Sequence, residues 1–239
     1  MSAMASSTSP GASAVYGVSV GVPVVEAGGV PGAGRVLPTR TELAAVLPWP
    51  GLRRGSTVAV HGSVSLLFAL LAEATANGSW AAVVGLAGIS LVAAAEAGVE
   101  LSRLAVVPRP GGDPAGVVAA LLDGVDLVAV GGTRRIADSD ARRLSARARN
   151  RGSVLLPFGP WAGAEVQLRC ADASWRGLGQ GHGYLRERAV TVHAGGRGAA
   201  SRPRSSRLLL PARSGAVGVP ADEPVEITRP RLRPVVGCS

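Results

Sequence analysis

The segment His61–Leu67 has the residue types that come nearest to phosphate binding, because a glycine and two serines follow an apolar run. A loop that binds nucleotide phosphates needs a long glycine-rich arc of backbone N–H groups, a lysine for the outer phosphates and a hydroxyl for magnesium. Here apolar residues stand where a second glycine and the lysine would be needed, and the 239 residues contain no lysine. We therefore predict a plain strand-to-helix turn, without cofactor or metal, in which the degenerate phosphate position is marked by Gly62, Ser63 and Ser65.

Two later apolar runs end without the acidic residues that nucleotide hydrolysis requires. Val125–Val130 should deliver a carboxylate for magnesium at its end, but Gly131 and Gly132 follow it. Its one acid, Asp126, stands at the start of the run, and we interpret it as a turn residue. The run that ends at Gly85–Gly88 also lacks an acid that could polarise a water molecule. We therefore expect no catalytic residues and no enzymatic activity.

The densest positive charge belongs to a predicted helix, Ser139–Arg151, and the residues just before it. On a helical wheel one sector, which should face a sheet, holds Ala137, Ala141, Leu144 and Ala148. The remaining surface carries candidates for contact with a DNA backbone or an acidic partner, namely Arg134, Arg135, Arg142, Arg143, Arg147, Arg149 and Arg151. A solvated helix face in an arginine-rich chain explains the pattern equally well. A second, weaker cluster in a predicted loop comprises Arg202, Arg204 and Arg207.

A glycine-rich segment, Gly177–Tyr184, connects two predicted antiparallel strands and so differs from a dinucleotide-binding loop, which joins a strand to a helix. We predict a flexible hairpin. Trp175 and Tyr184 flank it, and we expect them to pack within the domain rather than to stack on bases. His61 is the one histidine placed as a catalytic base would be, but no acid near it in sequence would orient it. A small-molecule hydrolase that uses His61 and a nearby serine is therefore a weak alternative.

Strand and helix patterns alternate through the middle of the chain, which favours an α/β fold with a mostly parallel sheet between helices. We predict strands at 57–61, 80–86, 104–107, 126–130 and 154–158. We predict helices at 41–47, 65–77, 90–97, 114–122 (capped by Asp113) and 139–151. After Trp161 the pattern becomes antiparallel, with strands at 165–174, 188–194 and 206–210. We expect a disordered leader at 1–38, one domain at 39–211 and a disordered Pro/Arg-rich tail at 212–239.

The composition bears on partners and compartment. The formal charge is +9 at pH 7 with arginine as the only strong base, which suggests nucleic acid or an acidic protein as a partner and also fits codon bias. Cys170 and Cys238 share no metal-binding spacing, and the first residues lack the basic start and unbroken apolar run of a secretory signal. The uncharged stretch Ala74–Ala95 contains turn residues, so we expect no membrane span and a cytoplasmic location.

Several short motifs, in their order along the chain, resemble RecA recombinases. Gly51–Gly55 leads into the first strand as the approach to a phosphate loop does, and a strand ending near Gly85, then Ala94–Val99, Leu104–Pro108 and Val125–Val130 follow. More closely, residues 37–211 resemble the RecA-like accessory proteins (ImuA-prime-like) encoded beside inactive Y-family polymerases in actinobacteria. Those proteins belong to a damage-induced mutasome that includes an error-prone C-family polymerase. The resemblance implies a RecA-like core with a C-terminal antiparallel extension.

The positions that perform chemistry in RecA carry over to this chain mostly as departures. The lysine and hydroxyl of the phosphate loop fall near Leu66 and Leu67, the catalytic glutamate at Ala87, the magnesium aspartate at Gly131, and the long DNA-binding loop shortens to Gly159–Gly163. The resemblance therefore implies a catalytically inactive adaptor in SOS mutagenesis and translesion synthesis. Its implied partner is the Y-family polymerase-like mutasome subunit, with the DNA backbone as a further candidate. The main alternative is a degenerate nucleotide-binding protein that regulates DNA association.

Overall fold

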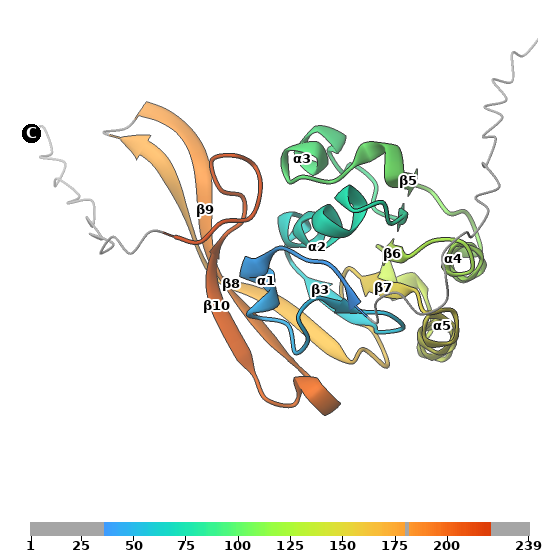
Figure 1. Ribbon diagram of the computed structural model, residues 1–239. Coiled ribbons are helices and arrows are strands. Elements are labelled where there is room, and N and C mark those ends of the chain that lie inside the picture. Colours follow the sequence, from blue (N-terminus) through green and yellow to red (C-terminus); the bar gives the residue numbers. More distant parts are fainter. Residues whose placement is uncertain (1–35, 180–181, 221–239) are drawn as a thin grey trace, which may run out of the picture.

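The computed structural model describes residues 36–179 and 182–220 (Figure 1). Most of the expected leader and tail therefore lies outside the described residues. The packed chain extends past both expected limits of the domain: β1 (Val36–Leu37) pairs antiparallel with β2 (Leu52–Arg53), and Gly218 forms a bridge with Leu209. The helix α1 (Thr41–Ala44) is shorter than the predicted one.

Two four-stranded sheets adjoin edge to edge and form the centre of the molecule. The first is parallel and contains β4 (Ala81–Val84), β5 (Leu104–Val107), β6 (Leu127–Val130) and β7 (Val154–Pro157) in the order β5-β4-β6-β7. The second contains β3 (Val58–His61), β8 (Val166–Gly179), β9 (His182–Gly196) and β10 (Arg204–Leu209) in the order β10-β9-β8-β3. Only β3 and β8 are parallel in this second sheet. Parallel bridges Thr57–Leu155 and Val60–Phe158 join β3 to β7, so the two sheets form one continuous surface.

Helices cover both faces of this surface (Figure 1). The first core contains α1, α2 (Val64–Ala76) and α3 (Leu91–Glu96), and the second contains α4 (Pro114–Leu122) and α5 (Asp138–Arg151). Alternation along β3 serves both cores, since Val58 and Val60 belong to the first and Ala59 to the second. Short 3₁₀ turns complete the chain at Leu101–Arg103, Thr133–Arg135 and Gly198–Ala200. The predicted α/β core is therefore confirmed.

Local signals account for where the helices begin and end. Asp113 accepts the backbone N–H of Gly116 at 2.8 Å, which confirms the predicted cap of α4. Gly152 ends α5 with a left-handed φ of 71°, which glycine adopts without strain. The buried sector predicted for α5 is correct for three of its members, but Ala137 is exposed and Ile136 is buried instead. Ala137 is the N-cap with ψ of 151°, so the helical wheel does not apply to it.

The C-terminal strands are longer than the sequence pattern predicts. β8 continues to Gly179 and β9 begins at His182, so the hairpin predicted for the glycine-rich segment is present, and the described residues of that segment belong to its paired strands. Two irregularities interrupt the strand pairing, between Ala171 and Ser174 and between Arg176 and Leu178. Such bulges break the in-out alternation on which the prediction depended. Within the described residues no helix is long and apolar enough to cross a membrane.

Candidate functional site

The connection from β3 to α2 lies at the carboxyl edge of the sheet, where ligands bind in open α/β folds. It consists of Gly62 and Ser63 alone, since β3 ends at His61 and α2 begins at Val64. The Oγ of Ser63 accepts a hydrogen bond from the buried backbone N–H of Leu66 at 3.2 Å. A phosphate at a helix N-terminus would need that same class of donor. The predicted strand-to-helix turn is therefore present, and its serine accepts one of the N–H groups that an anion at this helix terminus would use.

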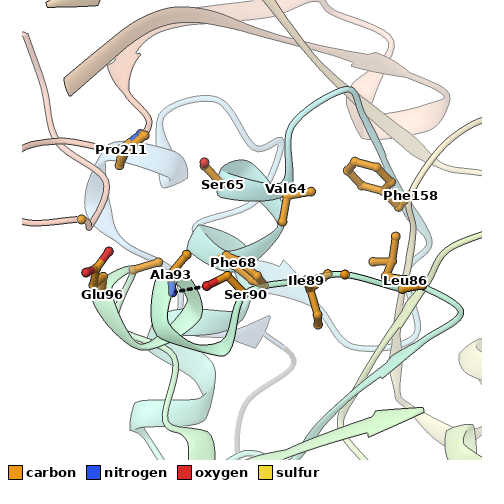
Figure 2. A pocket seen from close by; sticks show the side chains of 14 residues that line it. Val64, Ser65, Phe68, Leu86, Ile89, Ser90, Ala93, Glu96, Phe158 and Pro211 are labelled. Carbon is orange, nitrogen blue, oxygen red and sulfur yellow. Dashed lines mark hydrogen bonds between the residues drawn. The ribbon is translucent and has the colours of Figure 1, made fainter. Parts of the chain in front are cut away.

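The ends of β4 and β6 lie side by side at the same edge, because Val84 is paired with Val130. A Cβ on Gly131 would lie 2.7 Å from the backbone carbonyl oxygen of Gly85 and 2.5 Å from the side chain of Leu86. The carbonyl cannot move without disturbing the strand, so this position accepts no carboxylate side chain. Leu86 lies instead at this edge of the sheet, near Phe158 (Figure 2).

A cavity of about 490 Å³ opens beside this edge, against α2, the loop before α3 and the turn after β10. Its walls are mainly apolar and include Val64, Phe68, Leu86, Ile89, Phe158 and Pro211 (Figure 2). Ser65, from the degenerate phosphate position, also lines it. Glu96 is the one ionisable residue in the lining. A carboxylate opposes a polyphosphate, so the cavity suits an apolar group better than a nucleotide phosphate.

His61 stands at the end of β3, in register with Arg169 on β8. Burial lowers the pKa of His61, and the neighbouring Arg169 lowers it further. Within the described residues the imidazole Nε2 has no hydrogen-bond partner. Burial also raises the pKa of the nearby Cys170 thiol, although its hydrogen bond with Ser63 acts in the opposite direction. These groups provide no acid to orient the imidazole, as a triad would require.

The arginines predicted to cover α5 divide into those that pair with acidic residues of other elements and those that do not. Arg147 and Arg151 both bind Asp123 at the end of α4, with their Nε atoms 2.8 and 3.0 Å from Oδ1. The hydrogen bond from Arg147 holds the pKa of that carboxyl below its usual range, with further help from Arg151. The guanidinium of Arg149 lies 3.4 Å from Glu165. These three arginines therefore tie α5 to its neighbours.

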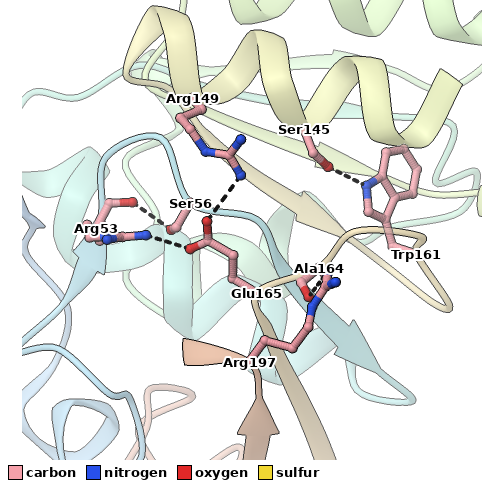
Figure 3. A network of polar contacts seen from close by, with 8 residues as sticks. All are labelled: Arg53, Ser56, Ser145, Arg149, Trp161, Ala164, Glu165 and Arg197. Carbon is pink, nitrogen blue, oxygen red and sulfur yellow. Dashed lines mark hydrogen bonds and ion pairs between the residues drawn. The ribbon is translucent and has the colours of Figure 1, made fainter. Parts of the chain in front are cut away.

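Glu165 links two elements in a polar network that also holds the loop after β7 (Figure 3). Its Oε2 accepts a hydrogen bond from Arg53 at 2.7 Å while Oε1 faces Arg149. The Nε1 of Trp161 donates to Ser145 of α5 at 3.0 Å, and the Trp161 side chain is buried. The short loop that the resemblance aligns with a DNA-binding loop is thus packed on α5.

All seven arginines of the predicted face are exposed, and four of them make no ion pair with another element among the described residues, namely Arg134, Arg135, Arg142 and Arg143. Arg143 makes only a 3.5 Å contact with Asp140 in its own helix, and its side chain is 82% exposed. The other three form no ion pair within residues 36–179 and 182–220. Arg134 and Arg135 belong to the 3₁₀ turn Thr133–Arg135, which begins two residues after β6 and so lies near its carboxyl end.

The second predicted arginine cluster is not in a loop throughout. Arg204 and Arg207 belong to β10, which begins two residues earlier than predicted. Arg204 donates to the carbonyl oxygen of Leu47 at 2.7 Å and so joins β10 to the segment after α1. Arg202 and Arg207 are exposed. Arg204 is therefore engaged within the protein, whereas Arg202 and Arg207 form no ion pair among the described residues.

Trp175 and Tyr184 do not pack within the domain, and that prediction is wrong. Trp175 is 50% exposed and Tyr184 is 78% exposed, both on the projecting part of the β8–β9 hairpin. Leu178 and Leu185 on the same hairpin are exposed by 61% and 51%. The prediction failed because both residues lie beyond the strands that flank the hairpin, β3 and β10, and no local sequence pattern shows how far a hairpin extends past its neighbours.

Comparisons with known proteins place this geometry among RecA-like folds. Residues 45–163 match the family model described as the MT3502 N-terminal domain. A protein of Mycobacterium tuberculosis, named uncharacterized protein Rv3395c, is 47% identical over 116 residues, which are 48% of this chain and 57% of that protein. The chain thus matches little more than half the length of that relative. A crystal structure of the RadB recombinase superposes with a TM-score of 0.55 at 13% identity, over 79% of this chain and 100% of that one. The chain has the RecA-like α/β fold.

Proposed function

We propose that this chain is a catalytically inactive RecA-like adaptor that acts in damage-induced translesion synthesis and mutagenesis. The observation that carries the proposal is the start of α2. Gly62 and Ser63 form the whole connection where a phosphate-binding arc would be required, and Ser63 accepts the N–H of Leu66. A scaffold with no place for a triphosphate is expected to act by binding other macromolecules.

The chemistry of phosphoryl transfer supports the absence of hydrolysis. Catalysis there depends almost entirely on positioned cations, a metal ion and a group that orients the nucleophile. The three relevant strand ends present Gly62, Ala87 and Gly131, which carry no such group. At Gly131 the neighbouring backbone excludes a carboxylate side chain altogether. We therefore expect no turnover of ATP.

Calorimetry with ATP and magnesium tests this part of the proposal. We expect no heat of binding, and phosphate release no faster than in buffer. Phosphate release that co-purifies with the protein, and that disappears in Gly62→Val, would contradict the proposal. The variant Gly78→Val serves as the matched control, because Gly78 lies beyond the other end of α2 and also combines a left-handed φ, 89° against 75° at Gly62, with open space for a Cβ.

The proposed partner is the Y-family polymerase-like subunit of a mutasome, with DNA as a second partner. Support comes from the motifs that resemble the accessory proteins of that complex, and from the recombinase fold. The exposed arginines near the end of β6 and on α5 supply cations that suit an acidic surface or a phosphate backbone.

Affinity capture from damage-treated cells tests the partner. The full chain should retain the polymerase-like subunit, and a chain that ends at Pro220 should retain less of it. That end point leaves the packed turn intact, because Gly218 pairs with Leu209 and Val217 is buried. If the full chain captures no polymerase-like subunit, this assignment is wrong.

The cavity favours one alternative, a degenerate nucleotide-binding protein that regulates DNA association. An adenine ring is apolar enough to enter a pocket lined by Phe68, Ile89 and Phe158. The same titration distinguishes the alternatives, since the adaptor gives no heat with ATP or with adenosine. Binding of adenosine that is lost when the pocket is narrowed by Ala93→Leu would favour the alternative.

A further inference from the structure

The β8–β9 hairpin continues beyond the sheet to which it belongs (Figure 1). β3 pairs with β8 only as far as Arg169, and β10 pairs with β9 only from Ala189. One further pair of hydrogen bonds joins Arg188 to the turn after β10. Past that point the described residues of the two strands pair only with each other. The end of the hairpin is therefore a two-stranded ribbon without a third strand of the described chain along either edge.

Two bulges bend this ribbon and direct its side chains outward. In β8 the first bulge includes Asp172, which has a left-handed φ of 51°. At the second, Gly177 is opposite the three residues 184–186, and a Cβ on Gly177 would collide with the carbonyl oxygen of Tyr184. Bulges of this kind re-aim side chains and end regular pairing. Tyr184 and Leu185, two of these three residues, are both exposed.

Aromatic rings and guanidinium groups occur together on the ribbon. The guanidinium of Arg188 lies 6.0 Å from the centre of the Trp175 ring. Two carboxylates belong to this part of the hairpin, Asp172 at the first bulge and Glu187. Glu187 lies 4.0 Å from Arg176 and 3.6 Å from Arg213, so its negative charge is compensated. Arg186 is exposed and forms no ion pair among the described residues. The ribbon therefore presents stacking faces together with uncompensated positive charge.

We propose that the ribbon binds single-stranded DNA, with bases stacked on Trp175 and Tyr184 and phosphates paired with Arg186 and Arg188. Stacking on aromatic rings beside cations is how proteins bind single strands without sequence preference. A duplex does not suit the ribbon, because its bases already stack on one another. The net charge of +9 complements a polyanion. The choice of DNA rests on the proposed function, whereas the stacking site rests on the hairpin alone.

The geometry also favours a nucleic acid strand over a protein partner. A stable protein interface buries about 800 Å² on each side, and a ribbon two strands wide offers few side chains with which to cover that area. A single strand needs only a line of stacking faces and cations. A protein partner would use the ribbon for its apolar surface and would tolerate leucine in place of an aromatic ring.

Fluorescence anisotropy with a labelled oligothymidylate of about 20 nucleotides tests the proposal. Trp175→Leu and Tyr184→Leu should each weaken binding at least about fivefold, since each removes one stacked base. Trp175→Phe should restore most of the affinity. The matched control is Leu91→Ala with Val92→Ala, which removes exposed apolar surface from α3. Thermal unfolding should be unchanged in all variants, because the replaced side chains are exposed.

Two further arms separate the possible outcomes. An abasic strand of equal length should bind weakly, because it keeps the phosphates and lacks the bases. Unaltered affinity in both leucine variants, or equal binding of the abasic strand, would overturn the stacking site. Loss of a captured protein partner in those variants, with DNA affinity unaltered, would overturn it in favour of a protein contact. ATP titrations on the same preparations report separately on the proposed function.

Discussion

Replacing Ser63 with alanine tests whether the start of α2 is closed to solvent and to ligands. Ser63 is 2% exposed, and its hydroxyl accepts the N–H of Leu66, which is completely buried. Loss of an N-cap costs about 1 kcal/mol, and a buried N–H left without a partner adds about as much again. We therefore expect Ser63→Ala to lower the free energy of unfolding by about 2 kcal/mol. For a domain of this size that corresponds to a fall in Tm of roughly 4–8 °C.

Ser90→Ala is the matched control for this variant. Ser90 caps α3 with the same geometry, its Oγ lying 3.2 Å from the N–H of Ala93, but it is exposed. Water can replace the lost acceptor there, so the free energy of unfolding should fall by only about 0.5 kcal/mol. Urea unfolding followed by far-UV circular dichroism measures both losses, and the m value should not change.

The comparison of the two serines can refute the reasoning. A loss in Ser63→Ala no larger than the loss in Ser90→Ala would mean that water reaches the start of α2. In that case the N–H of Leu66 would be accessible to a phosphate even without Ser63, and the proposal that this turn binds no nucleotide would lose its main support.

Two further predictions concern the charged groups. Arg142→Glu combined with Arg143→Glu should weaken binding of DNA or an acidic partner at low salt while changing the free energy of unfolding by less than about 0.5 kcal/mol. Arg147→Glu should instead destabilise the fold, because it places a carboxylate beside Asp123; unaltered binding in the first variant, or unaltered stability in the second, would contradict this division. Burial lowers the pKa of His61 in the folded protein, so the unfolded chain binds a proton on this residue more readily. The free energy of unfolding therefore keeps its full value above the ordinary pKa of about 6.5 and decreases as the pH falls from there toward the folded-state pKa. Urea unfolding between pH 7.5 and about 5.5 should show a smaller loss in His61→Gln than in the original chain, and equal losses would refute the assignment.

Most of the parallel core could be predicted because each element carries its own start and stop signals. Asp113 and Gly152 mark helix ends by side-chain and backbone properties that act locally. The strand order could not be predicted in the same way. Buried runs such as Val58–His61 and Val154–Pro157 look alike in sequence, and nothing local states that β7 lies between β3 and β6. The full length of β8 and β9 could not be predicted either, because the two bulges interrupt the alternation by which a strand is recognised in a sequence.

The residue types missing from the candidate site could be read from the sequence, but the contacts between its elements could not be predicted. The lack of lysine and of acids at the strand ends is legible in the sequence. The contact of Gly131 with the Gly85 carbonyl depends on strand pairing, and the contact of Arg147 with Asp123 joins two helices. A helical wheel gives the direction of a side chain but not the residue of another element that it contacts. Three of the seven arginines of the predicted face, Arg147, Arg149 and Arg151, therefore pair with acidic residues of the same chain although their side chains stay exposed.

The placement of the surviving charged and aromatic groups supports an adaptor over a single-ligand protein. The exposed arginines of α5 and the aromatic ribbon of the β8–β9 hairpin lie at opposite ends of the molecule (Figure 1). Between them, the continuous sheet is held by the bridges from Thr57 to Leu155 and from Val60 to Phe158. A small ligand could not touch both ends at once. Two macromolecules could, because each end is exposed independently and the rigid sheet would fix the distance between them. A variant that loses one contact should therefore keep the other, which is the behaviour expected of an adaptor and not of an enzyme with one central site.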